Sequence, residues 1–312
     1  MAMLLSHRSF PLFKLSIAGT LAFWCIVTIL YLNTTRLASS RQAENTSATS
    51  YAAKIPEKIW YKVGPSGQSN ESKEWMDDCL RKNPGYRSEI MTDQSADLFV
   101  KENFAFRPDI IETYFALSYP ILKADFVRYL ILFIEGGIWF DLDVSCEDTP
   151  INDWIPTEFK DAANLVVGWE FDVGWGEHIF RQFETWTIMA APKSPHILRV
   201  IDDIVDEVRE AKGAHLDGNV IDRVVDFTGP RKFTRGVFKS LELAINGTID
   251  NGSISHLVTP RLIGDTVIMP GYSFSASVNR YDPEVVVGPS FVKHHYAGSW
   301  KNEHGGEVRS NS

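Results

Sequence analysis

Two aspartates, Asp141 and Asp143, stand two positions apart at the end of an apolar run, a spacing at which two carboxylates can act together. In an extended strand, residues two apart project to the same face, so the two carboxylates would converge where the strand surfaces. Converging carboxylates repel each other unless a cation lies between them. Oxygen ligands suit Mn²⁺ and Mg²⁺, which keep coordination positions open for substrate phosphates. The pair therefore predicts a metal site that binds a diphosphate.

The elements that would position this pair are predicted from the pattern of apolar residues. A helix is expected over 121–135, with Pro120 in its first turn and Gly136-Gly137 just past its end. Further helices are expected over 74–81, 95–103, 195–212 and 237–245, and strands over 55–60, 86–91, 138–142, 165–169, 187–190, 267–269 and 291–295. Alternating strands and helices predict an α/β domain with a largely parallel central sheet.

The N-terminal part contains an uncharged apolar run over residues 15–32. About 18 residues in a helix span roughly 27 Å, close to the hydrocarbon thickness of a bilayer. We interpret residues 1–14 as a cytoplasmic tail, 15–32 as a transmembrane signal anchor, 33–53 as a lumenal stem and 54–312 as the catalytic domain. A cleaved signal peptide is the alternative, but the run exceeds the usual apolar core of about 7–15 residues and no small-x-small cleavage site follows it.

Glycosylation signals, charge and cysteines limit the protein's environment and partners. Five N-x-S/T sequons support a lumenal location, at Asn33, Asn45, Asn70, Asn246 and Asn251. The formal net charge of −9, without any run of Lys or Arg, argues against nucleic acid as a partner. Cys79 and Cys146 would share an oxidising compartment, so they are either disulfide-bonded or two buried free thiols.

Several motifs along the chain resemble glycosyltransferase family 32, and within it the fungal initiation-specific α-1,6-mannosyltransferase group. They are IPEKIW at 55–60, NPGY at 83–86, YPILKADFVRY at 119–129, GGIWFDLD at 136–143, GWEFD at 168–172, TGP at 228–230 and GDTVIMP at 264–270. The resemblance implies a GT-A-like domain that binds a nucleotide sugar, uses Mn²⁺ or Mg²⁺ and retains the configuration at the anomeric carbon.

The resemblance also implies roles for individual residues. The metal would be held by Asp141, Asp143 and His294. Donor contacts would come from Trp60, Asp125, Arg128, Tyr129, Asp141, His294, Trp300 and Lys301, and further catalytic carboxylates would be Glu170, Asp172 and Asp265. A carboxylate nucleophile and a same-face displacement assisted by the leaving phosphate both remain open as mechanisms.

Each of these roles has a structural alternative. Asp125 and Arg128 lie three positions apart on one helix face, so they could reach a nucleotide together or form only a local ion pair. His294 could complete a metal shell, because imidazole is a good Mn²⁺ ligand, or it could be structural. Trp300 could stack on a sugar or base, and Lys301 could contact phosphate.

The resulting functional prediction is a type II, single-pass Golgi-membrane α-1,6-mannosyltransferase. It would move mannose from GDP-mannose to an N-glycan core or a mannan chain, and other mannosyltransferase subunits could be its partners. The alternatives are a family member with another donor sugar or a sphingolipid acceptor, a non-catalytic subunit of a mannan-synthesising complex, and a phosphatase with a nucleophilic aspartate. A downstream acidic pair with lysine, which the phosphatase would need, was not found in the sequence.

Overall fold

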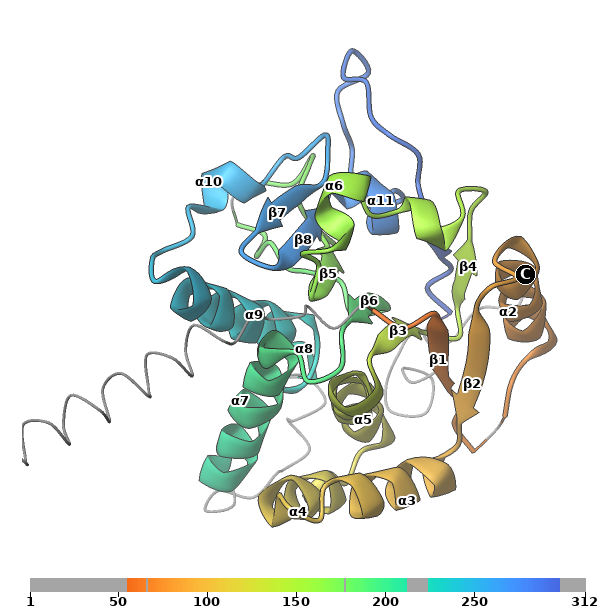
Figure 1. The fold of residues 1–312 in the computed structure, drawn as a ribbon, viewed down its shortest axis with the longest axis vertical. Coiled ribbons are helices and arrows are strands. Elements are labelled where there is room, and N and C mark those ends of the chain that lie inside the picture. The colour runs from red at the N-terminus through yellow and green to blue at the C-terminus, as the bar shows by residue number, and fades with distance from the viewer. Residues whose placement is uncertain (1–54, 66, 177, 212–223, 298–312) are drawn as a thin grey trace, which may run out of the picture. The chain divides into compact units, whose positions relative to one another are not determined.

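A seven-stranded sheet runs through the centre of the protein, as the computed structural model shows for residues 55–65, 67–176, 178–211 and 224–297 (Figure 1). In spatial order its strands are β2 (Arg87–Met91), β1 (Lys58–Lys62), β3 (Gly137–Phe140), β6 (Thr187–Ala190), β5 (Leu165–Gly168), β8 (Thr266–Met269) and β7 (Arg261–Ile263). The strands β6 and β7 run against the others, so the remaining five share one direction. The predicted α/β class with a largely parallel sheet is confirmed.

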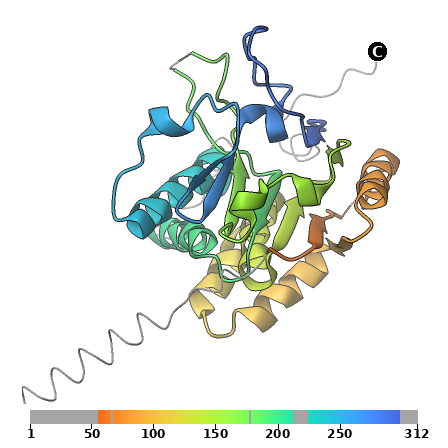
Figure 2. The ribbon, with the colours of Figure 1, turned by 45° about the horizontal axis from the view of Figure 1, so that its top comes forward.

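Helices enclose the sheet on both faces. They are α2 (Asn70–Lys82), α3 (Asp93–Asn103), α4 (Pro108–Ala116), α5 (Pro120–Glu135), α6 (Thr157–Lys160), α7 (Pro195–Ala211), α8 (Val224–Phe227), α9 (Pro230–Ile245), α10 (Asn251–Ile254) and α11 (Gly271–Ser275), with a 3₁₀ turn at Ile151–Asp153. One apolar cluster joins one face of the sheet to α3, α4, α5, α7 and α9. A second cluster joins the other face to α2 and α11. Figure 2 shows the sheet between these two layers.

The helix α5 follows the prediction because its boundary signals are local. Pro120 lies at its first turn, and Gly136 ends it with a φ of 65°. Gly137 follows with a φ of 99°, and a Cβ there would lie 2.5 Å from the carbonyl oxygen of Lys58 on β1. The two glycines therefore let the chain leave α5 and enter β3 directly beside β1.

The strand that precedes the two aspartates is shorter than predicted. β3 ends at Phe140, and residues 141–143 form a tight turn in which Val144 N–H donates to the carbonyl of Asp141 at 3.2 Å. The assumption that Asp141 and Asp143 share a strand face is therefore wrong, because a turn rather than a strand carries them. The helix α4 was also missed, and α9 begins at Pro230 rather than at 237.

A second, two-stranded sheet joins the end of the described chain to the turn at 141–143. β4 (Val144–Cys146) pairs antiparallel with β9 (Val292–His294), and Val144 lies opposite His294. Cys146 on β4 forms a disulfide with Cys79 on α2, with their Cα atoms 4.9 Å apart. Of the two states that the sequence left open, a disulfide and two buried free thiols, the structure has the disulfide.

The membrane anchor predicted at 15–32, its tail at 1–14 and the stem at 33–53 lie outside the described residues. Among the helices that the structure does describe, none combines the length and the apolar character needed to cross a membrane.

Loss of the disulfide should lower stability without changing the fold. The bond links residues 67 positions apart, so replacing both cysteines by serine should lower the free energy of unfolding by roughly 4 kcal/mol. Urea unfolding of the double serine variant and of the parent protein measures the difference. Equal unfolding midpoints in the two proteins would show that the bond does not form or does not stabilise.

Candidate active site

The first half of the candidate site is a buried ion-pair network around Asp141. Arg128 on α5 donates from Nη2 to Asp141 Oδ1 at 3.0 Å and from Nη1 to Asp125 Oδ1 at 3.0 Å. Trp139 Nε1 donates to the same Asp141 oxygen at 2.7 Å, and Thr228 Oγ1 donates to Asp125 Oδ2 at 2.9 Å. Asp125 and Arg128 thus share one helix face, as predicted, but the helix face that they share is buried.

Electrostatics hold Arg128 in its charged form. Burial alone would lower the pKa of Arg128, but the flanking carboxylates of Asp141 and Asp125 outweigh it and raise the pKa. The side chain of Asp141 is 30% exposed, whereas that of Arg128 is 5% exposed. Arg128 therefore bonds Asp141 from the buried side, and Asp141 is the member of the network that faces solvent.

The second half of the site is built around Asp143. Its Oδ1 lies 3.3 Å from His294 Nε2, and its Oδ2 accepts the N–H of Ala297 at 2.8 Å. Burial opposes the negative charge, but the contacts with His294 and the Ala297 N–H outweigh it and lower the pKa of Asp143. Asp143 is therefore an anion that links the turn at 141–143 to the segment from His294 to Ala297.

Trp186 connects the two halves of the site. Its carbonyl oxygen accepts the N–H of Asp141 at 3.0 Å. Its indole ring stacks on His294, with the ring centroids 4.2 Å apart and the planes 12° apart. Trp186 is therefore a contact of both halves of the site.

Two glutamates lie at the same edge of the sheet. Glu170 follows the end of β5, and its Oε2 accepts from Gln182 Nε2 at 2.6 Å. Glu184 precedes β6, is fully buried, and accepts the N–H of Thr187 at 2.7 Å. Burial raises the pKa of Glu184 well above its ordinary value, and the nearby charges of Glu170 and Asp141 raise it further, against the opposing Thr187 bond.

Sequence reasoning missed Glu184. The signal was present, because a charged residue stands in the otherwise uncharged run Gln182–Ile188 immediately before a predicted strand. Its side chain could not be placed without knowing that residues 182–184 run beside Gly168 and Glu170, as the bonds from Glu184 N–H to Gly168 O and from Glu170 N–H to Gln182 O show.

The structure does not bring every predicted residue to this place. Asp265 precedes β8, at the sheet edge opposite the turn, and its Oδ1 lies 2.6 Å from Nε2 of the buried His196. Asp172 is fully buried and accepts the N–H of His256 at 2.7 Å, which gives it a role in joining two loops. The structure therefore does not bring Asp265 to the turn, because Asp265 stands before β8 and the turn follows β3, which runs in the same direction.

Two of the predicted donor-binding aromatics are core residues. Trp60 is 2% exposed, and its Nε1 donates to the carbonyl of Gly136 at 2.9 Å. Tyr129 is fully buried, and its hydroxyl donates to the carbonyl of Thr228 at 2.9 Å. Their polar atoms are already bonded, so neither is placed to contact a donor. Trp300 and Lys301 lie outside the described residues.

The arrangement fits a divalent metal through two of the three predicted ligands. Asp143 and His294 are in contact, and a carboxylate with an imidazole is a suitable donor set for Mn²⁺. In the part of the chain that the structure describes, no group of three or more His, Cys, Asp or Glu residues is gathered closely enough to hold a metal. Asp141 is therefore not assembled with the other two as a third ligand.

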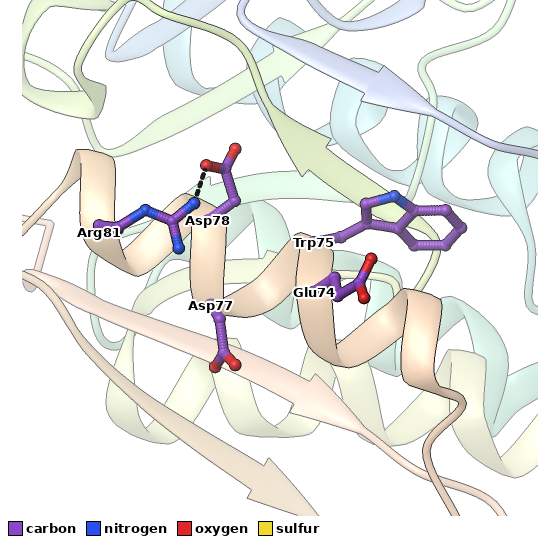
Figure 3. Close-up of a pocket in the computed structure, with 5 residues that line it drawn as sticks. All are labelled: Glu74, Trp75, Asp77, Asp78 and Arg81. Atoms are coloured by element: carbon purple, nitrogen blue, oxygen red, sulfur yellow. Dashed lines mark hydrogen bonds and ion pairs between the residues drawn. The ribbon is translucent and has the colours of Figure 1, made fainter.

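A separate surface pocket lies on α2 and is lined by Glu74, Trp75, Asp77, Asp78 and Arg81. Figure 3 shows that all five side chains project from this one helix. Arg81 pairs with Asp78 at 2.6 Å, and Trp75 stacks on His295 with ring centroids 3.9 Å apart. None of the predicted site residues lines this pocket.

Comparison with known proteins gives consistent matches. Residues 69–160 match the family model described as a glycosyltransferase sugar-binding region containing a DXD motif. The initiation-specific α-1,6-mannosyltransferase of Candida albicans is 31% identical over 80% of this chain and 73% of its own length. The enzyme of the same name from Schizosaccharomyces pombe is 31% identical over 81% of this chain and 65% of its own length.

The chain therefore spans about two thirds to three quarters of these two relatives. Among solved structures, PaToxG Glycosyltransferase aligns with 65% of this chain and 77% of its own, at 17% sequence identity and a TM-score of 0.44.

Replacing Arg128 by lysine should impair the site while keeping its charge. Lysine cannot bond two carboxylates through a rigid fork, so Asp141 should lose its fixed position and kcat/KM for glycosyl transfer should fall by roughly 100-fold. Arg107→Lys is the matched control, because Arg107 pairs with Asp109 and Asp202 far from the turn in sequence. Wild-type kinetics for Arg128→Lys would contradict the positioning role.

Glu184 should make stability depend on pH. Its folded pKa lies above its unfolded value of about 4.5, so the folded state holds more protons between the two values and stability falls as pH rises through that window. In Glu184→Gln, the free energy of unfolding should not show this fall as pH rises. Urea unfolding of both proteins from about pH 4.5 upward compares the slopes, with the exposed Glu158→Gln as the control. Parallel slopes for wild type and Glu184→Gln would refute the assignment.

Proposed function

This chain belongs to glycosyltransferase family 32, whose sugar-binding region contains the DXD motif, and we propose that it transfers mannose from GDP-mannose to an N-glycan core or a mannan chain. The observation that carries the proposal is the pairing of Asp143 with His294 beside the Arg128-supported Asp141, at one edge of the sheet. Family membership, with matches that extend over four fifths of the chain, supports a transferase and not the phosphatase alternative.

The residues around the turn account for donor binding in this proposal. Mn²⁺, or Mg²⁺, would be held by Asp143 and His294, and the bound ion would neutralise charge on the departing nucleoside diphosphate. Asp141 would contact the donor complex directly or through water, because it is the exposed member of its network. Arg128 would hold that carboxylate in position through its hydrogen bond, without touching the donor itself.

The remaining parts of the proposal concern stereochemistry and location. We expect an α-1,6 linkage formed with retention, on a GT-A-like domain. Glu170 follows the end of β5 at the same edge of the sheet and interacts with Tyr296, and it is the candidate acceptor-facing or oxocarbenium-facing group. The protein would act in the Golgi lumen, tethered as a single-pass type II protein through residues 15–32, with other mannosyltransferase subunits as candidate partners.

The test is a donor-turnover assay of the full chain. The protein is incubated with Mn²⁺ and GDP-mannose, with and without a mannose-terminated N-glycan, and released GDP and the product linkage are measured. We expect GDP release that the acceptor accelerates and a chelator abolishes. Asp143→Asn should reduce turnover by roughly 100-fold or more, because it removes the charge that pairs with His294 and the metal.

Asp148→Asn is the matched control, since it makes the same change in a fully exposed carboxylate. Isothermal titration of Mn²⁺ in the presence of GDP should show weaker binding for Asp143→Asn than for Asp148→Asn. Turnover of a different nucleotide sugar would show that the donor is that sugar nucleotide and not GDP-mannose. Binding of GDP-mannose without turnover would favour a non-catalytic subunit. Undiminished activity of Asp143→Asn would refute the metal site.

A further inference from the structure

Tyr296 has an uncommon backbone conformation beside the candidate site. Its φ is 50°, in the left-handed region that a bulky side chain rarely adopts. Asp143 holds the backbone on both sides of it: the Asp143 carbonyl accepts the N–H of His295 at 2.8 Å, and Asp143 Oδ2 accepts the N–H of Ala297 at 2.8 Å. Such conformations persist where surrounding contacts enforce them, and they are frequent at functional sites.

The ring of Tyr296 packs edge-on against both aromatic residues of the site. Its centroid lies 4.1 Å from that of His294 and 5.8 Å from that of Trp186, with interplanar angles of 62° and 73°. Tyr296 is nevertheless 44% exposed, whereas His294 and Trp186 are largely covered. Tyr296 is thus the aromatic residue of this group that a ligand can reach.

Acidic groups lie near the phenol of Tyr296. Glu170, Glu184 and Asp143 are each close enough to interact with it electrostatically. The aromatic ring that a ligand can reach therefore lies near carboxylates that can accept hydrogen bonds, with Glu170 first among them.

This combination suits a sugar. The carbon-bound hydrogens of a hexose pack on an aromatic ring, while its hydroxyl groups donate to nearby carboxylates. We propose that Tyr296 packs against a hexose ring of the substrate and helps to set sugar specificity, with the Glu170 carboxylate accepting from hydroxyl groups of the same sugar. The proposal rests on the proposed transferase function and assigns a sugar contact within that site.

The test removes the ring without disturbing the backbone. Tyr296→Gly keeps the left-handed conformation, because glycine adopts positive φ readily, and Tyr296→Phe keeps the ring while removing the hydroxyl. Lys193→Gly is the matched control, since Lys193 also has a positive φ, of 62°, but follows β6 at the opposite edge of the sheet. Thermal unfolding of all variants checks that the fold is kept.

We expect Tyr296→Gly to bind the sugar substrate about tenfold more weakly and to raise the corresponding KM, whereas Tyr296→Phe should recover most of the affinity. Isothermal titration with GDP-mannose and with a mannose oligosaccharide, alongside the KM of each, identifies which substrate supplies the hexose. A rise in KM confined to GDP-mannose places the donor sugar at Tyr296. A rise in KM confined to the oligosaccharide places the acceptor there.

The binding measurements separate this inference from the proposed function. If the wild-type protein binds a sugar substrate without turnover, the transferase function fails while weaker binding by Tyr296→Gly still supports the contact. If Tyr296→Gly matches the wild type and Lys193→Gly for both substrates, in affinity and in KM, the contact is overturned. The contact is also overturned if the wild type binds neither substrate.

Discussion

The candidate site depends on the position of one buried cation. Arg128 lies between Asp125 and Asp141 with almost no exposure, where an unpaired charge would be strongly unfavourable. The two terminal nitrogens of its planar guanidinium each bond one carboxylate, and Thr228 Oγ1 donates to the other oxygen of Asp125. Because the outer carboxylate of this chain of bonds is Asp141, the packing of α5 against β3 is transmitted directly to the group that faces solvent. The buried network therefore fixes the position of Asp141 on this side of the site.

The other side of the site depends on contacts between two segments that lie far apart in the sequence. Asp143 bonds to backbone groups of His295 and Ala297, more than 150 residues later, and β4 pairs with β9 to keep these segments together. The disulfide ties β4 to α2 as well. Trp186 then touches both sides, through its carbonyl to Asp141 and its ring to His294. One side of the candidate site is thus held by core packing, and the other by the pairing of β4 with β9.

Local signals explain which parts of the fold could be predicted. Pro120 and the Gly136-Gly137 pair mark both ends of α5 in the sequence, and the periodic apolar stripe of α7 marks its buried face. The short α4 has a similar proline signal at Pro108, but it is only 9 residues long and was overlooked. The turn at 141–143 was read as a continuing strand, because an apolar run does not show where sheet pairing stops.

The sequence by itself determined the chemical types at the site and the family, since the aspartates at 141 and 143, the DxxR pair at 125 and 128 and His294 are local motifs that can be read one by one. The tertiary structure alone decided which of them meet. It brought His294 to Asp143, placed the unforeseen Glu184 and Tyr296 nearby, buried Trp60 and Tyr129, and sent Asp265 to the opposite edge of the sheet. The physical reason is that strand order and direction, which local residue patterns do not encode, determine the sheet edge at which each side chain emerges.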